Sequence, residues 1–119
     1  MPKTSASSVP LCRLDEIPDG QARGFLLRDA AGREVRIFAV RRGGSAWAYV
    51  NRCPHRGTPL DWQPDRFLDA TGEHLICATH GALFRPDDGV CVAGPCLGDE
   101  LTRLAAWVVD GVVRLDGPG

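Results

Sequence analysis

The sequence lacks the features of several large protein classes. Positive and negative side chains nearly cancel, to a formal net charge of −1, so the chain has no basic field of the kind that attracts nucleic acids. It contains no apolar run of membrane-spanning length, and residues 1–8 lack the apolar segment of a signal peptide. Internal repeats, low-complexity blocks and a long 3.6-residue hydrophobic period are also missing. These absences favour a small cytoplasmic protein that is poor in helix.

Cysteine is the informative exception to this plain composition. The chain has five cysteines, an odd number that argues against a fold held by disulfides alone. In the cytoplasm, clustered cysteines bind metal more often than they pair with one another. A length of 119 residues suits one domain with a modest core. We therefore predict a single metal-binding domain over residues 9–116, preceded by a flexible arm at residues 1–8.

Short apolar segments separated by turn residues predict an all-β fold, an antiparallel sandwich or barrel. Gly43-Gly44 and Asp110-Gly111 are typical hairpin turns, and Pro10 suits an edge strand. Residues 99–106 are compatible with one helical turn, and residues 61–74 form the one irregular stretch. The expected strands cover residues 9–14, 23–28, 33–42, 45–51, 75–77, 82–85, 90–92, 104–109 and 112–115.

Two short arms carry the chemistry of the chain. The first is Cys53-Pro54-His55-Arg56-Gly57 and the second is Cys77-Ala78-Thr79-His80-Gly81. Each arm offers one soft sulfur ligand and one imidazole, so together they form a four-ligand metal constellation. The residue types leave three sites open: a structural zinc site, a mixed cysteine–histidine iron–sulfur site, and an all-cysteine cluster that also uses Cys91 and Cys96. The third would leave both well-placed histidines unused.

On these residues the sequence resembles the Rieske [2Fe–2S] family, and in particular the small Rieske-type ferredoxins of bacterial ring-hydroxylating oxygenase systems. The resemblance runs from about Leu11 to Leu115, and it includes a later Gly-Pro loop at Gly94-Pro95-Cys96. It implies a Rieske-type β-sandwich or barrel with one [2Fe–2S] cluster, bound by a small part at about residues 52–97. The ligands that it implies are Cys53 and Cys77 on the inner iron and His55 and His80 on the outer iron.

The sequence departs from the respiratory-complex branch of that family. Gly57 and Thr79 stand where that branch has a pair of disulfide-bonded cysteines, so that disulfide cannot form here. Ala82 and Phe84 stand where it has serine and tyrosine hydroxyls that bond to the cluster sulfurs. Fewer hydrogen bonds to sulfur stabilise the reduced state less, which predicts a potential of roughly −150 mV, at the low end of the Rieske range. The gap between the arms, residues 56–76, is also longer than expected for the small ferredoxins.

The remaining cysteines have less definite interpretations. Cys91 and Cys96 are expected to be two small buried side chains, and a disulfide or a redox-sensing pair is the open alternative. Cys12 is expected to lie in the core.

The function that the resemblance implies is electron transfer without catalysis. The protein would be a one-electron carrier between a flavin reductase and a terminal oxygenase, with neither nucleic acid nor a membrane as partner. The alternative is a small Rieske subunit or redox sensor that is stably docked on a larger oxidoreductase. A complete oxygenase would need a second iron held by two histidines and a carboxylate, and with His55 and His80 in use only His74 remains.

Overall fold

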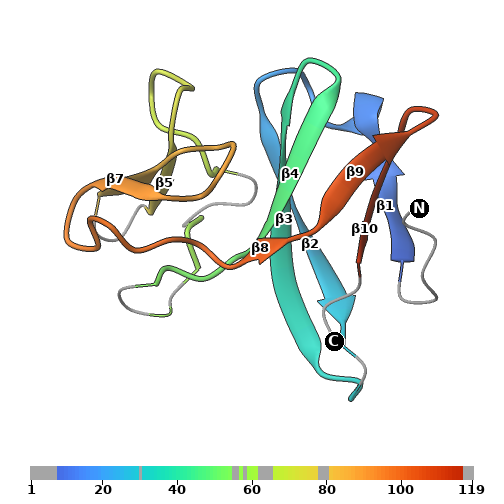
Figure 1. Ribbon diagram of the computed structural model, residues 1–119, viewed down its shortest axis with the longest axis horizontal. Helices are drawn as coiled ribbons and strands as arrows, with labels where there is room; N and C mark the ends of the chain where they lie inside the picture. Colours follow the sequence, from blue (N-terminus) through green and yellow to red (C-terminus); the bar gives the residue numbers. More distant parts are fainter. Residues whose placement is uncertain are drawn as a thin grey trace.

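The computed structural model describes residues 8–29, 31–54, 57, 59–61, 66–77 and 81–116. Within these residues ten strands form three antiparallel sheets, and the only helix is a short 3-10 turn at Leu14–Glu16. The predicted all-β fold is confirmed (Figure 1). No helix in this described part of the chain is long and apolar enough to cross a bilayer. The division into an arm and a domain stays a prediction, because residues 1–7 lie outside the described residues.

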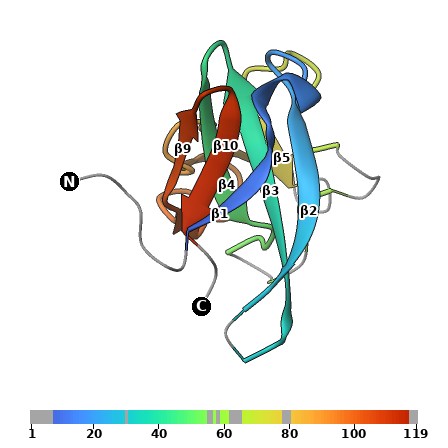
Figure 2. The same ribbon diagram turned by 90° about the vertical axis from the view of Figure 1, so that its right-hand side faces the viewer.

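Two of the sheets face each other around a common core (Figures 1 and 2). The first has the order β1-β10-β9, with β1 at Ser8–Arg13, β10 at Val112–Asp116 and β9 at Ala106–Val109. The second has the order β2-β3-β4-β8, with β2 at Ala22–Arg28, β3 at Glu34–Arg42, β4 at Ser45–Val50 and β8 at Arg103–Leu104. Ile37, Ala48 and Leu115 meet in the core between them.

The turn and edge predictions are confirmed. The β9–β10 hairpin turns through Asp110 and Gly111, both with positive φ (52° and 75°), as the tight two-residue hairpin requires. β1 is an edge strand, and its register shifts between Pro10 and Cys12. Residues 99–106, which are compatible with a helical turn by sequence, instead contain β8 and the start of β9.

The third sheet lies at one end of the molecule (Figure 1). Its strands are β5 at Leu75–Cys77, β6 at Ala82–Phe84 and β7 at Cys91–Ala93. The segment before β5 was expected to be irregular, but its described part folds back as a hairpin. Leu68 bridges Leu75, and the Ile76 amide donates to the Phe67 carbonyl at 2.8 Å.

Strand β3 joins this end to the rest of the protein because both of its faces are buried. Ile37 points into the core between the two larger sheets, whereas Phe38 and Val40 belong to a second core together with the third sheet. The Phe38 ring stacks on that of Phe67 with 4.4 Å between centroids, and both side chains are fully buried. The third sheet is therefore packed firmly onto β3.

Tyr49 on β4 makes a second contact between the larger sheets and the end of the molecule that holds the third sheet. We expect this residue to control the stability of the protein at high pH. Its hydroxyl donates to the Pro86 carbonyl at 2.7 Å, and burial raises the pKa of Tyr49. Above about pH 10 the unfolded chain loses this proton while the folded chain keeps it, so the unfolding free energy falls by about 1.4 kcal/mol per pH unit. Because Tyr49 is the only tyrosine, tyrosinate absorbance should appear only as the protein unfolds.

The matched control for this prediction is Tyr49→Phe. It removes the hydroxyl and leaves the buried Pro86 carbonyl without its donor, at a cost of about 1–3 kcal/mol near neutral pH. It should also remove the tyrosine part of the alkaline loss of stability. Free ionisation of Tyr49 in the folded protein near pH 10 would contradict the buried hydrogen bond.

Candidate metal centre

The two cysteines of the arms lie in one core, at the end of the molecule that holds the third sheet. Cys53 follows β4 after two residues, and Cys77 is the last residue of β5. Both side chains are completely buried and belong to the same group of packed residues. His55 and His80 lie outside the described residues, so their part in the site stays a prediction.

The two arms close with the same backbone hydrogen bond although the spacing from cysteine to histidine differs between them. In each arm the glycine four residues after the cysteine donates its backbone N–H to the cysteine carbonyl. The distances are 2.7 Å from Gly57 to Cys53 and 2.8 Å from Gly81 to Cys77. Both glycines have a left-handed backbone, with φ of 73° and 72°, a conformation that costs glycine little. The structure thus presents two buried cysteines, each at the start of an arm that a glycine closes in the same way.

Asn51 fixes the first arm, and the sequence interpretation missed it. Its side chain spans the arm: the Oδ1 atom accepts from the Leu60 amide, and the Nδ2 group donates to Asp61, both at 2.8 Å. Its own backbone amide donates to the Arg36 carbonyl on β3 at 2.8 Å. Asn51 is 8% exposed; its bond with Leu60 is buried and its bond with Asp61 is partly buried. The only signal in the sequence was a polar amide between a strand and the first cysteine.

A third loop, at Gly94-Pro95-Cys96, packs against the second arm. Gly94 has φ of 100°, and a Cβ at this position would lie 2.8 Å from the Cα of Ala82. Ala82 directly follows Gly81 of the second arm, so the loop backbone and the arm are in contact. The Gly-Pro loop recognised in the sequence therefore lies where it can cover the centre.

The residues beside the second arm supply no hydroxyl group. Ala82 and Phe84 are both fully buried on β6, and neither side chain carries a hydrogen-bond donor. Their positions agree with the sequence argument for weak stabilisation of a reduced centre. The low potential itself stays a prediction.

Cys91 and Cys96 lie close together in the same core. Each is 2% exposed, and the Cys96 thiol donates to the Cys91 sulfur across 3.1 Å. The Cys91 thiol in turn donates to the Ala93 carbonyl at 3.2 Å. Burial, followed by the hydrogen bond to Cys91, raises the pKa of Cys96 to about 12. The expectation of two small buried side chains is confirmed, and none of the five cysteines of the chain forms a disulfide in this structure.

The described residues argue against an all-cysteine metal site. All four cysteines of that alternative are described, yet among the described residues no group of three or more His, Cys, Asp or Glu side chains is arranged to hold a metal. His55 and His80, the other two ligands expected from the sequence, lie outside the described residues, so the ligand set stays a prediction.

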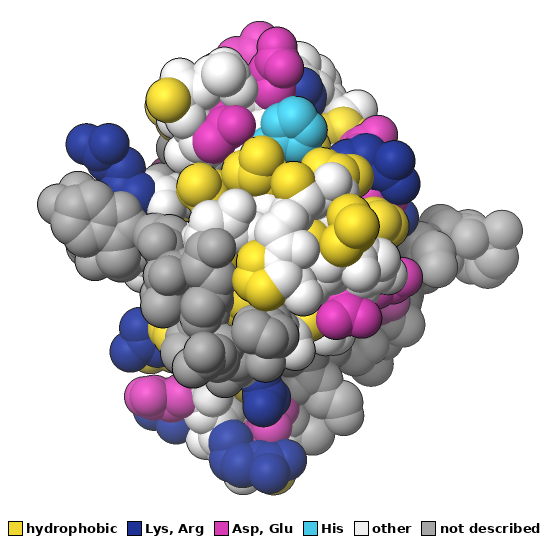
Figure 3. Space-filling view, turned by 90° about the vertical axis from the view of Figure 1, so that its left-hand side faces the viewer, with side chains coloured by type: hydrophobic (Ala, Val, Ile, Leu, Met, Phe, Trp, Pro, Cys, Tyr) yellow, Lys and Arg dark blue, Asp and Glu magenta, His cyan; other side chains and the backbone are white. Residues whose placement is uncertain are grey.

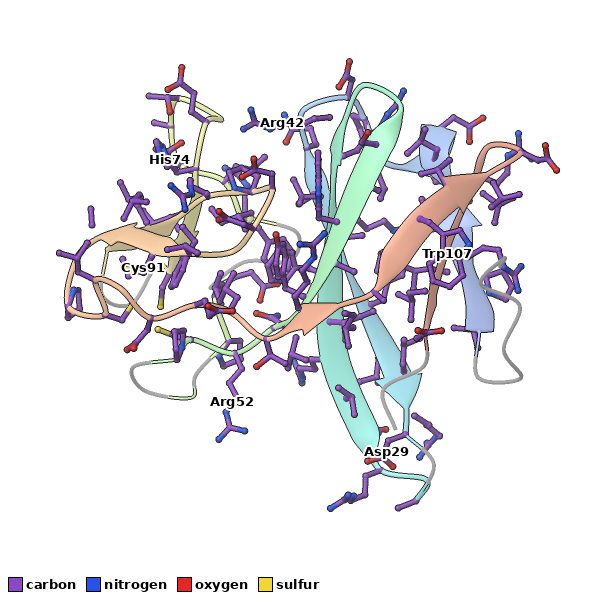
Figure 4. All side chains as sticks on the ribbon, in the orientation of Figure 1. Asp29, Arg42, Arg52, His74, Cys91 and Trp107 are labelled. Atoms are coloured by element: carbon purple, nitrogen blue, oxygen red, sulfur yellow. The ribbon has the colours of Figure 1, made fainter. Side chains whose placement is uncertain are left out.

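Basic side chains near the arms are solvent-exposed. Arg52 projects outward from the protein (Figure 4), and its guanidinium lies beside Gly57, which closes the first arm. Arg85 forms an exposed ion pair with Asp88 at 2.8 Å. Figure 3 shows this end of the molecule, where hydrophobic side chains gather near the middle of the face and charged groups surround them. The surface around the arms is thus mixed in charge and partly apolar.

Comparison with known proteins gives a family and a fold. The sequence profile of the Rieske [2Fe-2S] domain matches residues 7–108. A curated relative, the oxygenase component of chloroacetanilide N-alkylformylase from Rhizorhabdus wittichii, is 39% identical over 82 residues. That match covers 68% of this chain but only 20% of the relative, so the chain spans about a fifth of its length.

Two solved structures have the same fold at low sequence identity. The ferredoxin of carbazole 1,9a-dioxygenase from Nocardioides aromaticivorans superposes with a TM-score of 0.73 at 23% identity, covering 94% of this chain and 99% of that one. The terminal oxygenase of carbazole 1,9a-dioxygenase from Novosphingobium sp. KA1 has the same TM-score and identity, covering 94% of this chain and 30% of the other. The fold is therefore shared by a ferredoxin and by part of an oxygenase.

The described residues fit the cluster that defines the family. Two buried sulfur donors stand at the starts of the two arms, and each arm closes with a hydrogen bond from its glycine to its cysteine. In each arm the sequence places one histidine between this cysteine and this glycine. Soft thiolates are the ligands that iron–sulfur clusters require. The profile match covers most of the chain. This chain belongs to the Rieske [2Fe-2S] domain family, and its cofactor is one [2Fe–2S] cluster.

Proposed function

We propose that this protein is a one-electron carrier, which receives electrons from a flavin-dependent reductase and delivers them to a terminal oxygenase in the cytoplasm. The observation that carries the proposal is the pair of buried cysteines at the starts of the two arms in a Rieske-family chain. The cluster of this family takes up and releases one electron at a time, which supports electron transfer as the function.

The proposed ligands divide into two pairs. Cys53 and Cys77 bind one iron through their thiolates, and His55 and His80 bind the other through ring nitrogens. When bound, the [2Fe–2S] cluster supplies reversible one-electron reduction and oxidation. The complete burial of Cys53 and Cys77 keeps water away from the sulfur ligands, and Asn51 and Gly94 hold the loops on which the ligands stand.

An apolar surface beside the centre supports a transient protein partner. Leu97 is 69% exposed in the loop after Cys96, and Val92 is 36% exposed on β7. Apolar side chains with a polar rim are typical of the middle of protein interfaces. The partner class is suggested by the relatives: one solved structure is described as a complex of reduced oxygenase and oxidised ferredoxin in carbazole 1,9a-dioxygenase.

A second candidate is a small Rieske subunit or redox sensor that is stably docked on a larger oxidoreductase. The observation in its favour is that the fold matches a ferredoxin and a part of a terminal oxygenase equally well, with a TM-score of 0.73 for each. The two candidate functions differ in how long the protein stays bound to its larger partner. A carrier should purify alone and exchange between partners, whereas a subunit should co-purify with a large protein in a fixed ratio.

The decisive experiment starts from anaerobically purified protein. We expect a visible sulfur-to-iron charge-transfer band that bleaches with dithionite, and a reduced electron-paramagnetic-resonance signal with the low average g-value of mixed histidine and cysteine ligation. Reduction by NADH should then require a flavin reductase, and reoxidation should be accelerated by a terminal oxygenase with its substrate. A colourless protein with stoichiometric zinc would contradict the proposal. Reduction without reoxidation by any oxygenase would favour the docked subunit or sensor.

A further inference from the structure

Cys91 and Cys96 form a pair that neither the ligand assignment nor the electron-carrier function uses. Cys91 opens β7, and Cys96 stands five positions later at the end of the Gly94-Pro95 loop. Their sulfur atoms are 3.1 Å apart. A disulfide bond is about 2.0 Å long, so bond formation requires an approach of only about 1 Å. Figure 4 shows sulfur atoms gathered in this region, next to the label of Cys91.

The backbone holds the two cysteines in this arrangement. The Cys91 amide donates to the Asp99 carbonyl at 2.8 Å, and the Cys91 carbonyl accepts from Gly98 at 3.2 Å. The Asp99 amide donates to the Cys96 carbonyl at 2.8 Å, which closes the loop on itself. Both residues are thus anchored to the same short segment. The proximity of their sulfur atoms is a property of the folded loop and does not depend on a flexible surface side chain.

We propose that Cys91 and Cys96 are a reversible dithiol–disulfide pair beside the metal centre, with hydrogen peroxide as the oxidant. Both thiols are 2% exposed, which excludes bulky disulfide oxidants, but Pro95 and Leu97 on either side of Cys96 are exposed. Such nearly complete burial restricts the oxidant to a small molecule, and hydrogen peroxide is of that size. The proposal concerns the thiols of the chain itself and does not rest on the electron-carrier function.

The proposed reaction is balanced in two steps. Peroxide oxidises one thiol to a sulfenic acid: the O–O bond breaks, an S–O bond forms and one water leaves. The second thiol sulfur then attacks the sulfenic sulfur, so that the S–S bond forms, the S–O bond breaks and a second water leaves. Two thiols have lost two electrons and two protons, and one peroxide has become two waters. A dithiol reductant reverses the change by thiol–disulfide exchange.

Oxidation would tie the covering loop to β7. Cys91 and Cys96 belong to the same packed core as Cys53 and Cys77, and Gly94 between them touches the residue after the second arm. A disulfide would close this short loop covalently and restrict its opening. We expect the form with the Cys91–Cys96 disulfide to release iron to a chelator more slowly than the dithiol form does.

The test treats the whole protein with increasing doses of peroxide and then removes the excess peroxide. The remaining thiols are alkylated in denaturant, and the alkylated cysteines are counted and located. Alkylatable cysteines should fall from the five of the chain by two, and dithiothreitol should restore them. Cleavage before aspartate releases residues 88–98, which contain Cys91 and Cys96 and no other cysteine. This fragment should lose both alkyl groups and weigh two hydrogens less than the dithiol form. Glutathione disulfide at the same concentration should leave it unchanged.

Matched variants make the result specific. Cys91→Ser and Cys96→Ser should each prevent the loss of two hydrogens from this fragment, and the variant that keeps the first-oxidised cysteine should stop at the sulfenic acid, which dithiothreitol reduces. Cys12→Ser, on β1, should form the pair as the wild type does. The proposal is overturned if residues 88–98 of the wild type keep two alkylatable thiols at peroxide doses that bleach the cluster, or if they gain oxygen without losing hydrogen. A crosslink from either cysteine to Cys53 or Cys77 would overturn it as well. The wild-type result decides the question even if a variant fails to fold.

Discussion

Cys53→Ser and Cys77→Ser are each expected to abolish binding of the [2Fe–2S] cluster. A serine hydroxyl is a harder and much less acidic ligand than a thiol, and iron–sulfur clusters require soft thiolate donors. Both positions are completely buried, so no water can take the place of the missing sulfur without opening the core. Changes that only disturb the partners of a metal ligand cost about 10- to 100-fold in affinity, and loss of a ligand should cost more. Iron, sulfide and visible absorbance of purified protein measure the effect.

Cys12→Ser is the control for a general sensitivity to cysteine loss. Cys12 is half-buried on β1, in the sheet that does not carry the arms. Its replacement should leave the cluster content at the wild-type level. Full cluster content in Cys53→Ser or Cys77→Ser would show that the ligands lie elsewhere.

His55→Cys and His80→Cys test the nitrogen half of the same assignment. Exchange of a neutral imidazole for an anionic thiolate makes the site more negative, so an added electron is held less well. If the cluster is retained, we expect a lower midpoint potential and an altered visible spectrum in each variant. Spectra unchanged in both would remove the two histidines from the ligand set, whatever the cysteine variants show.

Local patterns in the sequence were sufficient for most strands and for the tight turns. Asp110-Gly111 predicts its hairpin because both positions need positive φ, and the structure has this conformation. The glycine after each histidine predicts a tight arm, and the two arms indeed close through Gly57 and Gly81. In these cases one or two residues determine the local backbone, so no information from distant parts of the chain was needed.

Features that depend on long-range packing were not predictable in the same way. Alternation along β3 indicates one apolar face, but it does not show that the opposite face, with Phe38 and Val40, is covered by the third sheet. Phe67 stacks on Phe38 from a segment that was expected to be irregular, because its hairpin has no strong turn signature. The proximity of Cys91 and Cys96 likewise depends on how one loop closes.

The candidate metal centre also has residues that the local sequence predicts and residues that only long-range packing reveals. Its cysteines were recognisable from their spacing to histidine, whereas Asn51 was not, since its importance comes from Leu60 and Asp61 on the far side of the arm. A side chain that holds a ligand loop needs no particular motif. It needs only the right donors and acceptors at the right distance, which the folded chain alone reveals.

Gly94→Ala is expected to be the most destabilising single-methyl change near the centre. The new Cβ would stand 2.8 Å from the Ala82 Cα, a backbone atom that cannot rotate away, and φ of 100° is strained for any residue with a side chain. Backbone strain costs about 1–3 kcal/mol and overpacking about the same, so we expect a loss of about 2–6 kcal/mol. Against a typical domain stability of about 5–15 kcal/mol, such a loss brings the fold close to its limit.

Gly98→Ala separates the two contributions to that loss. Gly98 belongs to the same loop and has a similar φ of 91°, but a Cβ there would meet nothing within 4 Å. It should therefore show the cost of backbone strain alone, about 1–3 kcal/mol. Urea unfolding followed by tryptophan fluorescence, together with the rate of cluster loss, compares the variants. Equal destabilisation by both would mean that the loop does not press on the second arm, whereas faster cluster loss in Gly94→Ala alone would show that this contact holds the arm in place around the cluster.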